Sequence, residues 1–321
     1  MKKFNRFVVV CSPESSRADE YDQKITHELR QIAATCNAEL VEISLKDKPY
    51  FATVQLVRDS LKDGDVVIGA GGDGINQATL QGAFESKRDI TAGFLSLGNA
   101  NDFATALNGH IKSPLKILTS PTINFQPLEL SINDKPRFFI ASYATLGVTT
   151  IAVEQLNSAE IRHSRKHLAK LSPIAALRSE SLSKISHAIN DLKFTPFKRD
   201  CLVHHDDSVG FFLIPAAKGI LRPSGISNFL IRDDFFFHFD NVRKKSPGRG
   251  WISKGLVAGR WATFGLPGSI SDYEKLEFLR PSDMIIHIGG DTVNLNAVKT
   301  ISAERVQRSI KVFAPRKSLQ V

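Results

Sequence analysis

The segment at 66–74, VVIGAGGDG, joins an apolar run to a loop that is mostly glycine and keeps one carboxylate. Because glycine has no Cβ, Gly71, Gly72 and Gly74 would let a ligand approach the backbone where a strand ends. Backbone N–H groups in such a loop, at the positive end of a following helix, bind phosphate. Asp73 would repel phosphate unless it handles a metal ion or a hydroxyl proton, so it favours phosphoryl-transfer chemistry over a plain turn.

A second polar loop follows the next apolar run, in FLSLGNANDFATAL at 94–107. Its polar and glycine positions are Gly98, Asn99, Asn101 and Asp102. Helix capping alone could explain Asn101 or Asp102. Two such loops at the ends of consecutive parallel strands open on the same edge of a sheet, so we expect them to form one cleft. The GxxxxGK[ST] spacing is absent, which disfavours a P-loop NTPase, and an ordinary dinucleotide-binding domain is not expected.

The elements that must position these loops alternate between two periods. Apolar runs typical of strands lie at 7–11, 39–45, 65–70 and 90–97, and helical spacing of apolar residues lies between and after them. This alternation predicts an α/β, doubly wound nucleotide-binding domain with a parallel sheet, over residues 1–122.

Strand-like runs dominate the rest of the chain. We predict a second, β-rich domain over 123–321, folded as a mostly antiparallel β-sandwich. A polar, basic stretch at about 151–192 predicts a helical insertion, and the last strand or strands are expected to return to the first domain.

Composition excludes several classes of protein. With 321 residues, 42% hydrophobic and 23% charged, the chain is expected to fold as a globular protein with two cores. Three widely spaced cysteines without a CxxC pair indicate neither a disulfide framework nor a zinc site, and fit a reducing cytoplasm. The N-terminal apolar run FVVVC is too short for a signal peptide, and we expect neither export nor a membrane span.

The formal net charge of +9 favours an anionic partner. Nucleic-acid binding would rest on that charge alone, without a recognisable motif, and is not expected. Basic segments at 161–170 and 243–251 could instead rest on anionic lipid, at about 1 kcal/mol per basic residue, although ordinary surface charge explains them equally simply. The sequence leaves open whether the protein is a homo-oligomer.

The two loops together resemble the catalytic domain of the diacylglycerol kinase family, which includes sphingosine and ceramide kinases and bacterial soluble lipid kinases. That family reads GGDGT-x-NE and then P-L-G-T-G-N-D-F-A, and this chain has GGDGINQA at 71–78 and SLGNANDFA at 96–104. The resemblance extends over nearly the whole chain, because an α/β domain followed by a β-sandwich is the family's architecture. It is also the plan of NAD kinase.

Three weaker matches follow from the same resemblance. Ser12, in CSPESSR, stands where the family has the asparagine of an N-P-x-S-G loop. Asp233 and Asp234 match the start of a D-D-G-x-x-D-V segment that holds a structural metal ion, although an exposed turn explains them at least as well. Gly289, Gly290 and Asp291 stand where the family has D-G-E, whose acidic residue is its proposed general base.

The resemblance implies an ATP-dependent lipid kinase that transfers the γ-phosphoryl of MgATP to a lipid hydroxyl, with diacylglycerol or a related lipid at a membrane surface as the acceptor. Asp73 and Asp102 would position metal-bound phosphates and Asp291 would accept the hydroxyl proton, although Asp291 reads equally well as a turn residue. The residues implied to bind the nucleotide are Ser12, Gly71, Gly72, Asp73, Gly74, Gly98, Asn99, Asn101 and Asp102.

Several positions depart from the family pattern, and the departures keep alternatives open. The changed residues are Ile75, Gln77, Ala78, Asn99 and Ala100, and each is expected to remove a polar contact or backbone freedom near the nucleotide. A catalytically impaired nucleotide- or lipid-binding protein is therefore one alternative. An NAD kinase-like enzyme is the other, although GNANDFA fits the lipid kinases better.

Overall fold

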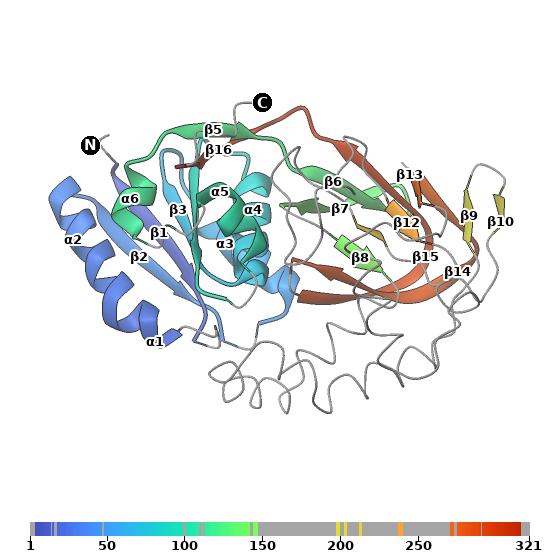
Figure 1. Cartoon of the computed structure of the whole chain (residues 1–321), viewed down its shortest axis with the longest axis horizontal. Helices are drawn as coiled ribbons and strands as arrows, with labels where there is room; N and C mark the ends of the chain where they lie inside the picture. Colours follow the sequence, from blue (N-terminus) through green and yellow to red (C-terminus); the bar gives the residue numbers. More distant parts are fainter. Residues whose placement is uncertain are drawn as a thin grey trace.

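The computed structural model describes two large β-sheets and a small three-stranded one, with helices gathered around one of the large sheets (Figure 1). The described residues are 4–315, without 14, 16, 17, 47, 99, 100, 109, 110, 112, 142, 143, 273, 274, 290 and most of 147–269. Within that last range the structure describes 197–199, 202–203, 212–213 and 237–239. The proposed helical insertion, Asp233, Asp234 and both basic segments lie outside the described residues.

The first sheet has six strands in the order β2-β1-β3-β4-β16-β5. β1 to β4 run parallel, while β16 is parallel to β4 and antiparallel to β5. The strands are β1 Arg6–Cys11, β2 Glu39–Ser44, β3 Val66–Gly71, β4 Thr91–Ser96, β5 Thr122–Phe125 and β16 Ile310–Phe313. The inner strands are nearly continuous apolar runs because helices cover both faces of the sheet.

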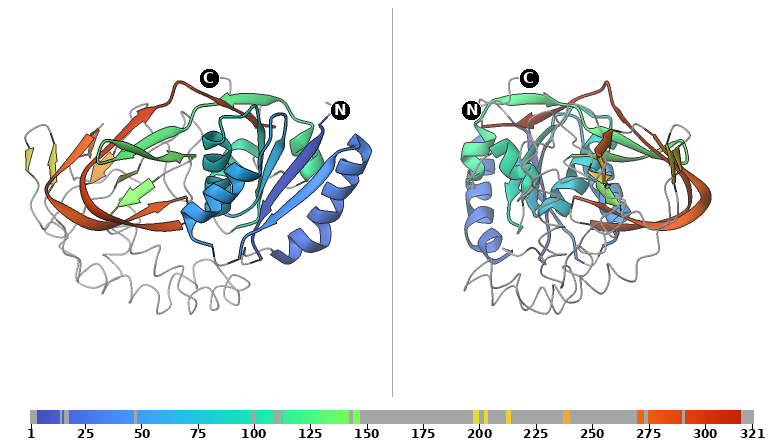
Figure 2. Two further views of the ribbon diagram at one scale, coloured as in Figure 1. Left: turned by 180° about the vertical axis from the view of Figure 1, so that it is seen from behind. Right: turned by 45° about the vertical axis from the view of Figure 1, so that its right-hand side comes forward.

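The helices divide between the two faces of this sheet (Figures 1 and 2). They are α1 Ala18–Glu20, the π-helical turn η1 Tyr21–Ile25, α2 Thr26–Cys36, α3 Tyr50–Ser60, α4 Asp73–Glu85, α5 Asp102–Asn108 and α6 Pro114–Leu118. α2 and α6 share one apolar cluster with Phe7 and Ile68, and α3, α4 and α5 share another with Val8 and Phe94. This arrangement is doubly wound, as predicted.

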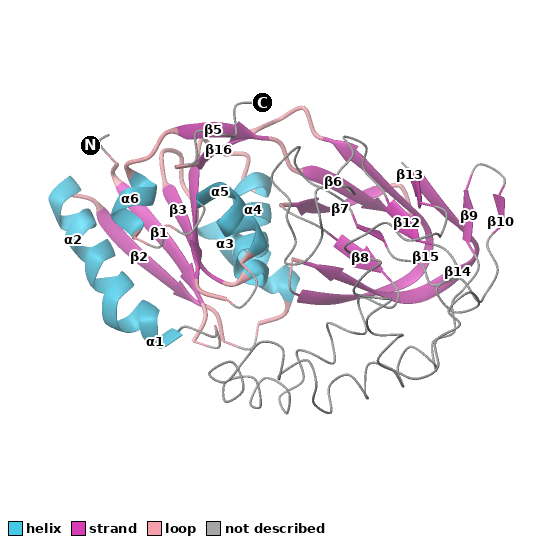
Figure 3. Cartoon of the chain, viewed as in Figure 1, coloured by secondary structure: helices cyan, strands magenta, loops and turns pink. Residues whose placement is uncertain are grey.

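The second sheet is antiparallel in all of its described pairings. Its order is β10-β9-β14-β15-β6-β7, with β8 also paired to β14. The strands are β6 Leu128–Ile132, β7 Lys135–Ile140, β8 Ala144–Leu146, β9 Phe197–Arg199, β10 Leu202–Val203, β14 Lys275–Ile288 and β15 Asp291–Arg305. A further sheet joins β11 Phe212–Leu213, β12 Phe237–Phe239 and β13 Ile270–Asp272. The predicted fold class is thus confirmed (Figure 3).

The β14–β15 hairpin brings the second sheet to the helices of the first. Ile288 pairs with Asp291, so the hairpin turns between them, and Gly289 has φ +53°. In Figure 1 the two long strands sweep from the far side of the sheet toward α3 and α4, where the hairpin turns. α3 contacts β15 and α4 contacts β7, so these two helices lie between the sheets. No helix among the described residues is long and apolar enough to cross a membrane.

Candidate active site

The two glycine loops meet backbone to backbone. β3 and β4 are parallel neighbours, with Gly71 opposite Ser96, so both loops leave the same edge of the sheet. A Cβ built on Gly98 would lie 2.3 Å from the Cα of Gly72 and 3.2 Å from its nitrogen. No side chain could move to relieve that overlap. Glycine at position 98 is therefore required by the closeness of the loops.

Asp73 lies where two helices begin. It is the first residue of α4, its exposed fraction is 8%, and Gly72 before it offers no capping side chain. One carboxylate oxygen, Oδ1, accepts a hydrogen bond from the backbone N–H of Phe103 at 3.3 Å, in the first turn of α5. The carboxylate therefore lies at the N-terminal ends of two helices, where negative charge is stabilised.

The side chain of Asn101 stabilises the second loop through two hydrogen bonds. Its Oδ1 accepts from the Gly98 N–H at 2.6 Å, and its Nδ2 donates to the Gly98 carbonyl at 2.5 Å. Asn101 is buried with φ +54°, a left-handed conformation that asparagine tolerates better than most residues. Its amide thus shapes the loop, while Asp102 begins α5 and Asn99 lies outside the described residues.

The side chain of Asp291, in the second sheet, contacts the glycine loop. Asp291 opens β15, just after the turn of the hairpin. A Cβ built on Gly74 would lie 2.8 Å from Asp291 Oδ2 and 3.0 Å from Cγ, so the carboxylate lies directly against Gly74 in the first turn of α4. Asp73 and Asp291, far apart in the sequence, therefore lie at the same helix N-terminus.

Two further sequence-predicted positions lie at the same edge of the sheet. Ser12 follows β1, whose last residue Cys11 pairs with Ala70 of β3, so it leaves the same edge of the sheet. Gly71 is packed against the side chain of Ile75, with a notional Cβ only 2.6 Å from Ile75 Cβ. Ile75, which replaces a family threonine, therefore covers the start of the loop.

Gln77 differs from its expected role. Sequence reasoning placed its change near the nucleotide, but its side chain points into the second sheet, where it bonds to the backbone of Phe139 and Ala141. Tyr50, which sequence reasoning missed, bonds to Gln77 at 3.1 Å. Burial chiefly raises the pKa of Tyr50, and the nearby charge of Asp291 raises it further. Tyr50 therefore keeps its proton.

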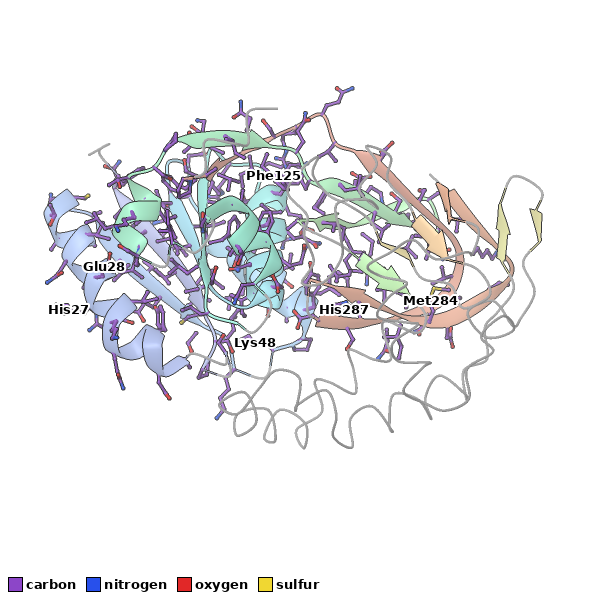
Figure 4. All side chains as sticks on the ribbon, viewed as in Figure 1. His27, Glu28, Lys48, Phe125, Met284 and His287 are labelled. Carbon is purple, nitrogen blue, oxygen red and sulfur yellow. The ribbon has the colours of Figure 1, made fainter. Side chains whose placement is uncertain are left out.

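His287 is a second residue that sequence reasoning passed over. It lies in β14 near the inner end of the hairpin, with Met284 farther out along the strand (Figure 4). Only 2% of its surface is exposed. Burial lowers its pKa to about 4, so it is neutral at pH 7.

Comparison with known proteins agrees with the fold and the loops. Residues 6–125 match the family model of the diacylglycerol kinase catalytic domain. The resemblance to that family is therefore confirmed for this part of the chain. No curated protein shows significant similarity to the chain.

Solved structures from Bacillus anthracis str. Sterne share the fold. A candidate diacylglycerol kinase is 16% identical with a TM-score of 0.60, and the match covers 99% of this chain and 100% of that one. A structure described as a diacylglycerol kinase is 15% identical with a TM-score of 0.56, and the match covers 99% of each chain. At these identities the likeness concerns the fold.

Proposed function

We propose that the protein is an ATP-dependent lipid kinase that transfers the γ-phosphoryl of MgATP to a hydroxyl of diacylglycerol or a related lipid. The observation that carries this proposal is the Asp291 carboxylate against Gly74, at the helix N-terminus that also bears Asp73. Phosphoryl transfer requires positioning and charge neutralisation more than covalent chemistry, and this constellation supplies groups for both.

Phosphate binding is assigned to the joined loops. Gly72, the residue before α4, has no side chain of its own to cap the helix, and helix N-terminal amides bind anions. The close approach of Gly72 and Gly98 keeps side chains away from the backbone where the two loops meet. Ser12, at the same edge, and Asn99 are proposed as further nucleotide contacts.

Magnesium fits the acidic residues at this point. No group of three potential metal-ligand side chains occurs among the described residues, but Mg²⁺ in kinases typically uses one or two carboxylates together with phosphate oxygens. Asp73 would hold the ion, and a bound Mg²⁺ would neutralise charge on the phosphates. Asp233 and Asp234 remain proposed ligands of a separate structural metal ion.

Asp291 is assigned the role of general base. It would accept the proton of the lipid hydroxyl as that oxygen attacks the γ-phosphorus and the bond to the β-phosphate oxygen breaks. Asp291 is one methylene shorter than the family's glutamate. Its contact with Gly74 shows that the hairpin nevertheless carries the carboxylate as far as the glycine loop.

A kinase of this kind works on substrate held in a membrane. We therefore propose a cytoplasmic protein that associates peripherally with anionic lipid, as the net charge of +9 favours.

The assay that tests the function offers labelled MgATP to diacylglycerol, sphingosine and ceramide in mixed micelles, with NAD as a separate acceptor. Label in one lipid is the expected result. Label in NAD alone would make the protein an NAD kinase-like enzyme. ATP binding without label in any acceptor would contradict the proposed activity and favour a catalytically impaired binding protein.

A further inference from the structure

The outer edge of β7 is covered by a helix. β7 is the last strand of its sheet, and an open edge leaves backbone groups without partners. Gln77 donates to the Phe139 carbonyl at 2.8 Å and accepts from the Ala141 N–H at 2.7 Å, and Gln81 donates to the Arg137 carbonyl at 3.2 Å. Four residues of helix rise about 6 Å and two residues of strand about 7 Å, so both pairs can form together.

Tyr50 ties the two glutamines together. Its hydroxyl accepts from Gln77 Nε2 at 3.1 Å and donates to Gln81 Oε1 at 2.6 Å. All three side chains are buried. Gln77 Nε2 therefore has two acceptors and Oε1 has one donor, which leaves one orientation for the amide. The network sets a single register between α4 and β7.

Gln77 alone of the two glutamines also reaches the hairpin turn. A Cβ built on Gly289 would lie 2.6 Å from Gln77 Cβ and 3.3 Å from the Asp73 carbonyl oxygen. The stem of Gln77 therefore packs against the turn that precedes Asp291, and its amide holds β7. Gln81 is one helical turn farther from the glycine loop, and it is not among the atoms nearest to Gly289.

We propose that Gln77 is a positioning residue for Asp291. Its stem seats the β14–β15 turn and its amide fixes the second sheet on α4, so that the Asp291 carboxylate stays on Gly74. The kinetic consequence rests on the proposed lipid kinase function, whereas the structural consequence does not. In the sequence, the change from the family's asparagine to Gln77 suggested a lost contact near the nucleotide. In this proposal Gln77 instead acts through Asp291.

Two matched variants test this role. Gln77→Ala and Gln81→Ala remove the same atoms one helical turn apart, and each breaks a bond to Tyr50 and a bond to a β7 carbonyl. Both should lower the thermal midpoint. Only Gln77→Ala should speed amide hydrogen exchange in a peptide covering 284–295. Its kcat should fall about 10- to 100-fold while KM for ATP changes less than about twofold, because the carboxylate is misplaced and the nucleotide loop is intact.

A milder variant guards against loss of folding. Gln77→Asn keeps an amide but shortens its reach, so the same changes are expected in smaller degree. Equal hydrogen exchange at the turn and equal kcat in the Gln77 and Gln81 variants would overturn the proposal. If the unmodified protein labels no acceptor, the lipid kinase function fails, while the exchange comparison still decides the role of Gln77.

Discussion

At the scale of single residues, the central feature is a pair of carboxylates at one helix N-terminus. Asp73 belongs to α4 itself, and Asp291 arrives from the hairpin of the second sheet. Helix dipoles offset part of this negative charge, and a cation bound with phosphate would offset more. Two acidic groups so placed match the needs of a metal-assisted transfer to a hydroxyl.

The variant Gly74→Ala should affect thermal stability and phosphoryl transfer differently. Alanine is favoured over glycine in a helix by about 0.5–1 kcal/mol, but its methyl group would lie where the Asp291 carboxylate now sits. We expect an unchanged or higher thermal midpoint together with a loss of phosphoryl transfer of about 100-fold. Calorimetry and the transfer assay measure the two effects, and full activity in this variant would show that Asp291 need not lie there.

At the scale of elements, the two loops act as one unit because their backbones touch. Gly98→Ala would force its methyl group onto the Gly72 backbone, whereas a Cβ on Gly93, in the preceding strand β4, would meet its nearest atom, in Phe313, at 3.4 Å. Gly98→Ala should therefore weaken ATP binding at least about 10-fold, while Gly93→Ala should bind as before. Isothermal titration measures both affinities, and equal affinities would contradict a shared phosphate site.

The order of elements around the loops could be predicted, because it is encoded locally. The apolar run of β3, the glycines after it and the helix that starts at Asp73 are neighbours in the sequence. The contact between Asp291 and Gly74 depends on a hairpin from the other end of the chain, and local periodicity carries no such information. Sequence reasoning therefore left Asp291 as either base or turn residue.

Gln77 shows the same limit of prediction from local sequence. Its position beside the glycine loop suggested that the change from the family's asparagine removes a contact near the nucleotide, but Gln77 lies one full turn into α4. Asp73 and Gln77 lie on the same face of α4, one turn apart, and the Gln77 side chain is placed beside β7, where it bonds to Phe139. The available signal was a second glutamine, Gln81, four residues farther along the same helix.

At the scale of the whole molecule, the helices α3 and α4 pack against the first sheet and also contact strands of the second. β16 follows β15 and enters the first sheet between β4 and β5, so the chain ties the two sheets together a second time. Glycine again permits close packing, since a Cβ on Gly82 of α4 would lie 2.8 Å from the Val54 carbonyl oxygen of α3. Stability should therefore depend on groups buried between the sheets.

The free energy of unfolding should also depend on pH, through the buried His287. Its pKa is about 4 when folded and about 6.5 when unfolded, so the unfolded chain binds more protons between these values and stability falls as pH falls. Lowering the pH from 7 to 5 should cost about 2 kcal/mol through this residue. Denaturant unfolding of the unmodified protein and His287→Leu measures the difference, and parallel pH profiles would contradict it.

The most direct test of the central claim compares Asp291→Asn with Asp291→Glu in the transfer assay. Asparagine keeps the size of the side chain and removes its basicity, whereas glutamate restores the family's residue. We expect Asp291→Asn to lose at least about 100-fold in kcat with ATP affinity kept within about twofold, and Asp291→Glu to retain transfer. Undiminished transfer by Asp291→Asn would contradict the assignment of this carboxylate as the base.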